Sequence, residues 1–213
     1  MTNVKEMINQ LTNHISLNNE MKHILSVIDR GLFSPSYARH LSYTLEAIHM
    51  GNGRWMQSPL TVVIIAQYLE LKQSDKLLEI GCGSGYQAAI LSKMCQKIYT
   101  IDCDSIILDK AQKYFEILNI ENVQSILAFG EQDWEPKETF DRIVFSLSVE
   151  EVPNIYVYKL AENGIIIAPL EIRDNYQILT KYHKKNGVIR IESIEQCSFI
   201  SMSSIIEKCS VKK

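Results

Sequence analysis

Residues 76–91, KLLEIGCGSGYQAAIL, combine a strand, a glycine-rich turn and the start of a helix. The apolar run that ends at Ile80 is typical of a strand buried in a sheet. Gly81 and Gly83 permit a tight turn and a close approach of a ligand to the backbone, and Gly85 opens the helix. Ligands of parallel sheets bind beyond the carboxyl ends of the strands, so this stretch predicts both an α/β fold and the position of its site.

Strand and helix patterns alternate along the rest of the chain. Strands are predicted at 76–81, 97–102, 123–127, 141–147 and 164–170, and helices at 59–71, 84–95, 104–118 and 153–160. This alternation implies right-handed crossovers and a parallel sheet covered on both faces. Strands at 176–183 and 188–194, joined by a turn at 184–187 that contains Asn-Gly, predict an antiparallel hairpin.

The first thirty residues carry helical spacing, with apolar residues at Val4, Met7, Ile8 and Leu11 and again from Met21 to Ile28. The sequence therefore predicts one domain over residues 1–213, with a three-layer, Rossmann-like α/β sheet that is mostly parallel and ends in an antiparallel hairpin. Residues 1–58 form an N-terminal helical extension and a substrate mouth, and residues 59–213 form the cofactor-binding core.

Composition narrows the class of protein. The formal net charge of −3 argues against a nucleic-acid binder that relies on bulk positive charge. The longest apolar run, residues 60–66, is too short to cross a bilayer, and the first ten residues have no apolar core, so no membrane span and no signal peptide are expected. The five cysteines form no C-x-x-C pair, which predicts reduced thiols in a cytoplasmic protein, with neither a disulfide framework nor a metal site.

The spacing of the glycines in this turn indicates which cofactor the site binds. Asp102 ends the second strand of the core, where its carboxylate can accept hydrogen bonds from both hydroxyls of a ribose. A dinucleotide site requires a third glycine where this chain has Tyr86, which disfavours a nicotinamide-dependent oxidoreductase. The G-x-G-x-G spacing after Glu79 fits S-adenosylmethionine better, with Glu79 orienting the loop or meeting the methionine ammonium. Glu79, Gly81, Cys82, Gly83, Gly85 and Asp102 are the predicted cofactor-binding residues.

Three segments carry a resemblance to a known family. Residues 57–102 contain QSP before a helix and then EIGCGSGYQAA; residues 29–35 read DRGLFSP, followed by Tyr43; residues 140–169 begin FDRIVFSLSVEEVP. Over roughly residues 29–170 the chain resembles the protein-L-isoaspartate O-methyltransferase family. The resemblance implies a class I methyltransferase fold with its last two strands exchanged, S-adenosylmethionine as cofactor, and an isoaspartyl residue of a damaged protein as substrate in protein repair.

The chain departs from that family in two places. The family mouth, G-x-G-Q-T-I-S-x-P, is here GNGRWMQSP at residues 51–59, with Trp55 at the threonine position and Gln57 at the serine position. The family's G-D-G after the third strand is here residues 128–130, AFG. The resemblance therefore implies that Phe129 and Gly130 lie beside the adenine, with a core position as the alternative for Phe129.

Methyl transfer to a carboxylate requires no general base, because the carboxylate is already ionised at neutral pH. The enzyme contributes positioning and the removal of water. The catalytic roles predicted for Gln57 and Ser58 are accordingly those of orienting donors. Arg54 and Trp55 are the predicted substrate-binding residues, the alternatives being a surface arginine and a tryptophan packed under the N-terminal helices.

Three functions stay open from the sequence. The first is carboxyl methylation of isoaspartyl protein, the second is a methyltransferase of the same fold with another acceptor, and the third is a cofactor-binding module that has lost turnover.

Overall fold

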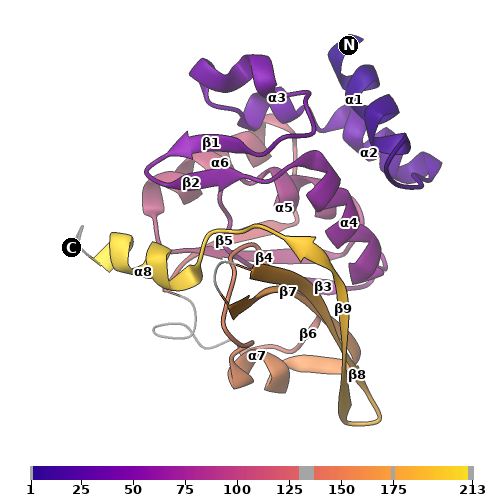
Figure 1. The fold of residues 1–213 in the computed structure, drawn as a ribbon, viewed down its shortest axis with the longest axis vertical. Helices are drawn as coiled ribbons and strands as arrows, with labels where there is room; N and C mark the ends of the chain where they lie inside the picture. The colour runs from indigo at the N-terminus through magenta and orange to yellow at the C-terminus, as the bar shows by residue number, and fades with distance from the viewer. Residues whose placement is uncertain (1, 130–136, 174–175, 211–213) are drawn as a thin grey trace.

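A seven-stranded sheet lies at the centre of the protein in the computed structural model, which describes residues 2–129, 137–173 and 176–210 (Figure 1). Its strand order is β5-β4-β3-β6-β7-β8-β9. The strands are β3 (Lys76–Ile80), β4 (Lys97–Asp102), β5 (Val123–Leu127), β6 (Phe140–Phe145), β7 (Leu160–Arg173), β8 (Tyr176–Lys185) and β9 (Val188–Cys197). The first five strands pair in parallel, and β8 and β9 add an antiparallel hairpin. This arrangement confirms the predicted sheet, and the last strands follow one another in chain order.

The hairpin turn is shorter than predicted. β8 runs to Lys185, so the turn consists of Asn186 and Gly187 alone, with φ angles of 53° and 72°. Two successive residues in the left-handed region form the type of two-residue turn that suits the twist of a hairpin, and Asn-Gly is the sequence that adopts it most readily.

Two apolar clusters cover the two faces of the sheet, because successive side chains of a strand point to opposite faces. Leu77 of β3 belongs to the cluster that includes α4 (Pro59–Leu69), α5 (Tyr86–Leu91) and α6 (Ser105–Ile117). Its neighbour Leu78 belongs to the opposite cluster, which includes Tyr156 of α7 (Asn154–Tyr158). The three layers predicted from the alternating pattern are therefore present. The helix predicted at 84–95 is shorter, beginning at Tyr86 after the left-handed Gly85 and ending at Leu91.

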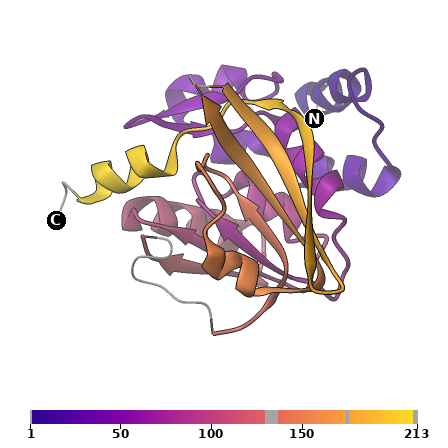
Figure 2. The same cartoon turned by 60° about the horizontal axis from the view of Figure 1, so that its bottom comes forward.

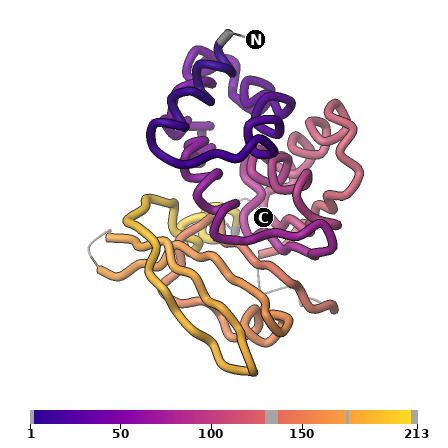
Figure 3. Tube along the Cα trace, turned by 90° about the vertical axis from the view of Figure 1, so that its right-hand side faces the viewer, coloured from indigo at the N-terminus to yellow at the C-terminus, as the bar shows by residue number. Residues whose placement is uncertain are grey.

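The N-terminal segment packs on the same side as α4 to α6 and gathers at the end of the molecule opposite the β8–β9 hairpin (Figure 3). It contains α1 (Thr2–Thr12), α2 (Asn19–Val27), α3 (Arg30–Phe33) and the 3₁₀ helix η1 (Ser36–Leu41). Apolar residues such as Leu11 and Leu25 are completely buried there, which confirms the predicted helical extension. Among the described residues, no helix combines the length and apolar character that a membrane crossing requires.

A hairpin and a helix that border the site are absent from the prediction. A short antiparallel hairpin, β1 (Ile48–Gly51) and β2 (Arg54–Met56), forms within the segment before α4. A final helix, α8 (Met202–Ser210), extends from the body of the protein near that hairpin (Figures 1 and 2). Both elements border the carboxyl end of the parallel strands, where the site was predicted.

Candidate functional site

The glycine turn after β3 forms one wall of a cleft, as the sequence predicts. Gly83 has a φ of 52°, and a Cβ atom at this position would meet no atom within 4 Å. The space in front of Gly83 is therefore open to a ligand, whereas a Cβ at Gly85 would lie 2.9 Å from the Cβ of Ala111 in α6. Gly83 thus keeps the cleft open, and Gly85 allows close packing of the turn against a helix.

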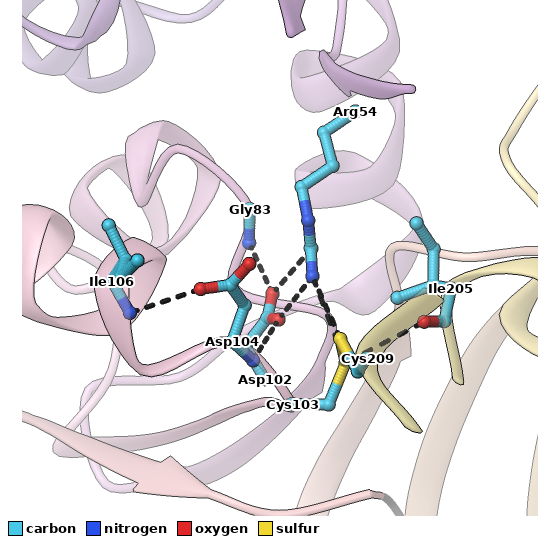
Figure 4. Close-up of polar contacts among 8 residues, drawn as sticks. All are labelled: Arg54, Gly83, Asp102, Cys103, Asp104, Ile106, Ile205 and Cys209. Atoms are coloured by element: carbon cyan, nitrogen blue, oxygen red, sulfur yellow. Dashed lines mark hydrogen bonds and ion pairs between the residues drawn. A yellow bond between two sulfur atoms is a disulfide. The ribbon is translucent and has the colours of Figure 1, made fainter. Parts of the chain in front are cut away.

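Asp102 lies beside this turn at the end of β4, buried from solvent. Its carboxylate accepts hydrogen bonds from the backbone N–H groups of Gly83, at 3.1 Å, and Asp104, at 3.2 Å. The guanidinium of Arg54 binds both carboxylate oxygens, at 3.0 and 3.2 Å (Figure 4). The carboxylate that is predicted to bind a ribose therefore lies in the cleft, and its partner there is an arginine from the mouth.

Glu79 is completely buried at the base of the cleft. Its carboxylate accepts hydrogen bonds from the Thr100 hydroxyl at 2.6 Å and from Gln87 Nε2 at 2.9 Å. Burial nevertheless outweighs these donors and raises the pKa of Glu79 from 4.5 to about 7. A cationic group in the cleft would favour the ionised form of this carboxylate.

The raised pKa of Glu79 predicts a dependence of stability on pH. Folded protein retains a proton on Glu79 between about pH 4.5 and about 7, where the unfolded chain has lost it, so this group's contribution to stability falls as the pH rises through that range. We expect wild type to lose on the order of 2 kcal/mol relative to Glu79→Gln between about pH 4.5 and pH 8. Urea unfolding of both proteins across that range measures the difference. A difference that stays constant with pH would contradict the titration.

Gln87 is a site residue for which the sequence predicts no role. It lines the cleft from the first turn of α5, and its Nε2 also donates to Ser146 at 2.7 Å. Its Oε1 atom is buried, and no described residue donates a hydrogen bond to it. A buried acceptor without a donor fits a cleft that receives a ligand N–H group. The signal in the sequence is a glutamine in an otherwise largely apolar helical segment, eight positions after Glu79.

Arg30 holds the mouth, residues 51–59, to the N-terminal segment. Its fully buried guanidinium donates hydrogen bonds to four carbonyl groups: those of Ser42, Thr44, Glu46 and Gln57, at 2.8 to 3.1 Å. This residue belongs to the DRGLFSP segment that carried part of the family resemblance. Four bonds to carbonyls from two separate segments fix the backbone of Gln57 at the rim of the cleft.

The predicted mouth residues lie in different surroundings. Trp55 lines the cleft and is 46% exposed, with its ring edge-on to that of His49, so it does not pack under the N-terminal helices. Gln57 also lines the cleft. The Ser58 hydroxyl caps α4 by accepting a hydrogen bond from the Thr61 N–H at 3.1 Å. Arg54 is buried, which contradicts the alternative of a surface arginine.

The opposite end of the cleft is lined by Ala128 and Phe129, together with Met202, Ile205 and Ile206 of α8. We refer to these five residues as the adenine end. Phe129 therefore lines this cavity, while its predicted contact with an adenine stays a prediction, and Gly130 is outside the described residues. Cys82 lines the middle of the cleft, and burial raises the pKa of its thiol well above the usual value, so the thiol is neutral.

The expectation of five reduced cysteines is wrong for one pair. Cys103 and Cys209 form a disulfide across 106 residues of sequence, with their Cα atoms 6.2 Å apart. Cys82, Cys95 and Cys197 are free thiols. The sequence contains no signal for this pair because Cys209 reaches Cys103 only through the position of α8.

Removing the charge of Asp102 tests its place in the site. Asp102→Asn keeps the shape of the side chain but removes the charge that strengthens hydrogen bonds to ribose hydroxyls, so we expect about tenfold weaker binding of S-adenosylhomocysteine, or about 1.4 kcal/mol. Calorimetric titration measures the change. Asp141→Asn is the matched control, since Asp141 stands at the opposite end of the sheet, where its carboxylate accepts a bond from the Lys76 N–H. Equal affinity of Asp102→Asn and wild type would remove Asp102 from the site.

The comparisons with known proteins agree with this geometry. The family model of protein-L-isoaspartate(D-aspartate) O-methyltransferase (PCMT) matches residues 2–207. The protein-L-isoaspartate O-methyltransferase of Helicobacter pylori strain P12 is 33% identical over 195 residues, which cover 91% of this chain and 93% of that protein. That of Thermosipho melanesiensis is 35% identical over 182 residues, covering 84% and 91%.

A solved structure shows the same fold. The crystal structure of a Plasmodium falciparum protein described as a protein-L-isoaspartate O-methyltransferase, in complex with S-adenosyl-L-homocysteine, superposes with a TM-score of 0.78 at 23% identity. The match covers 93% of this chain and 97% of that one. The fold and the family match thus define a class I methyltransferase. Within that class, the chain belongs to the protein-L-isoaspartate(D-aspartate) O-methyltransferase family.

Proposed function

We propose that this enzyme transfers a methyl group from S-adenosylmethionine to the free carboxylate of isoaspartyl residues in damaged proteins, and that it does so in the cytoplasm. One observation carries the proposal: a single cleft is lined by Glu79, the glycine turn and Asp102 on one side and by the mouth residues Arg54, Trp55 and Gln57 on the other. A donor site and an acceptor entrance therefore open into the same space.

The residues of the cleft fit the cofactor, which supplies an electrophilic methyl group on a sulfonium. Asp102 would hold the ribose hydroxyls, and Phe129 would contact the adenine. Glu79 and the unpartnered Oε1 of Gln87 would accept hydrogen bonds from the ammonium of the methionine end. The open space in front of Gly83 leaves room for the chain between these groups.

On the acceptor side, the residues of the mouth position an ionised carboxylate rather than activate it. Gln57 is held at the rim through its own carbonyl by Arg30, which leaves its side-chain amide to donate to a substrate oxygen. Ser58 contributes through the cap that fixes the start of α4. Arg54 would leave Asp102 to the ribose and pair with the substrate carboxylate, because a planar guanidinium binds two carboxylate oxygens at once. Trp55 lines the entrance and would shield it from water when a substrate is bound.

The test is transfer of a labelled methyl group to an isoaspartyl peptide and to the same peptide with a normal aspartyl residue. We expect transfer to the isoaspartyl peptide alone, in a base-labile ester. Binding of S-adenosylhomocysteine without transfer to either peptide would leave the fold and cofactor site intact but would contradict the proposed substrate.

A further inference from the structure

Helix α8 is fixed at both of its ends. At its beginning, the Ser148 N–H donates to the Ile200 carbonyl at 2.8 Å, and the Met202 N–H donates to the Ser148 carbonyl at 2.9 Å. These bonds attach the helix to the loop that follows β6. Near its other end, Cys209 forms the disulfide with Cys103, the residue that directly follows Asp102. Cleavage of one covalent bond would therefore release one end of the helix while the other stays attached.

The buried face of α8 lies in the cleft. Ile205 is 3% exposed and lines both the middle of the cleft and the adenine end, where Met202 and Ile206 also contribute. Together with Phe129, these apolar side chains line the space in which the adenine is proposed to bind. That space holds little more than a water molecule, so entry of an adenosine requires α8 to move away from Phe129.

The disulfide also touches the ribose end of the cleft. Arg54 Nη2 lies 3.6 Å from Cys209 Sγ and 3.8 Å from Cys103 Sγ, while the same guanidinium binds Asp102 (Figure 4). The disulfide, Arg54 and Asp102 therefore form one contiguous cluster. While the bond is intact, α8 stays at the adenine end and the sulfur atoms help to keep the guanidinium on the ribose-binding carboxylate.

We propose that Cys103 and Cys209 are a redox-modification site that controls access of the cofactor to the cleft. The proposal rests on the cofactor position given under Proposed function. In the oxidised form, α8 is tied over the adenine end and Arg54 is held on Asp102. In the reduced form, α8 swings about its attachment at residues 200–202, and both ends of the cleft open.

The chemistry is a two-electron exchange with a dithiol reductant. A thiolate of the reductant attacks one sulfur of the pair, the protein S–S bond breaks, and the other cysteine leaves as a thiolate that takes up a proton. The second thiol of the reductant then displaces the first cysteine, so that the protein gains two thiols and the reductant becomes a disulfide. Oxidation by a peroxide reverses the change: one thiol is converted to a sulfenic acid with loss of water, and the other thiol attacks it with loss of a second water.

The surroundings of the pair favour such exchange. Cys103 is partly exposed, and a groove lined by Asn52, Asp104, Glu207 and Lys208 opens beside Cys209, so a reductant can reach the bond. A neighbouring guanidinium stabilises a departing thiolate, which speeds cleavage. The other three cysteines are outside any disulfide: Cys82 and Cys95 are buried, and Cys197 is half-buried. In reducing compartments such as the proposed cytoplasm, protein disulfides are mostly transient and redox-sensing. The proposed role of the Cys103–Cys209 bond agrees with this rule.

The experiment measures cofactor affinity in the two redox states of the full chain. Wild-type protein is oxidised with a small excess of hydrogen peroxide or reduced with dithiothreitol, the state is verified by mass spectrometry of the 103–209 linked peptide, and S-adenosylhomocysteine is titrated by calorimetry. We expect at least tenfold tighter binding to the reduced form. Backbone amide hydrogen exchange of residues 202–209 should also be faster in the reduced form. This second measurement detects the release of α8 itself, which calorimetry does not.

Two variants serve as matched controls. Cys209→Ser should bind as tightly as reduced wild type under both conditions, whereas Cys197→Ser, which removes a free and half-buried thiol, should respond to redox state as wild type does. Three outcomes would each overturn the proposed redox control of cofactor access. They are equal affinity of oxidised and reduced wild type, failure of the 103–209 bond to form under peroxide, and a redox response that persists in Cys209→Ser. Absence of binding in every form would overturn the cofactor site itself, and so separates the two proposals.

Discussion

Gly83→Val is expected to fold and to show no measurable binding of S-adenosylhomocysteine, a loss of more than about a hundredfold in affinity. A Cβ at Gly83 would enter the open space of the cleft and touch no protein atom, so the protein itself offers no clash. The two methyl groups of valine would instead fill the volume that the cofactor needs. The backbone φ of 52° adds strain for a β-branched residue, but that strain acts on stability rather than on the ligand.

Gly187→Val is the matched control for that strain. Gly187 also has a positive φ, 72°, with no atom within 4 Å of a Cβ, but it lies in the β8–β9 turn. Both variants should lose stability in thermal unfolding, and only Gly83→Val should lose the cofactor. If Gly83→Val binds as wild type does, the cofactor lies elsewhere and the assignment of the cleft fails.

The parallel part of the sheet could be predicted closely from the sequence. The strands at 97–102 and 123–127 were predicted to the residue, because each carries β-branched or aromatic residues that are typical of strands. β7 is longer than predicted, since it begins at Leu160 and reaches Arg173, beyond the apolar centre that marks a strand in sequence. Where neighbouring strands supply hydrogen bonds, polar residues can extend a strand that periodicity alone would end.

The unpredicted elements are short and depend on tertiary contacts. β1 and β2 have four and three residues, too few for an alternating pattern to be distinguished from a loop. In α8, Met202, Ile205 and Ile206 form a short apolar face. The surface against which this face packs exists only once the sheet has folded. The Cys103–Cys209 disulfide could not be predicted for the same reason, because it forms only when α8 lies in this position.

The candidate site likewise has a part that could be predicted from the sequence and a part that depends on tertiary contacts. Glu79, the glycine turn and Asp102 follow from the rule that ligands bind at the carboxyl ends of parallel strands, and the structure brings them together. The pairing of Arg54 with Asp102 could not be predicted, because it depends on the β1–β2 hairpin that folds Arg54 over the end of β4.

Trp55→Thr combined with Gln57→Ser is expected to raise the rate of isoaspartyl methylation by up to about a hundredfold over a weak wild-type activity. Both residues line the cleft, and Trp55 stands in the entrance against His49. A tryptophan in place of a threonine-sized side chain narrows that entrance for a main chain that carries an extra backbone methylene. Smaller hydroxyl residues should restore both room and donors.

Initial rates of methyl transfer to an isoaspartyl peptide and its aspartyl twin measure the effect, with S-adenosylhomocysteine affinity as a check that the donor site is unchanged. Tyr158→Thr, which removes an aromatic ring that is 78% exposed on α7, is the control for the loss of a surface ring and should leave the rate unchanged. If wild type is already fast and the double variant is slower, the tryptophan and the amide are themselves the positioning groups of this mouth. Arg54, the one charged residue of residues 51–59, would act on the carboxylate beside them in that case as well.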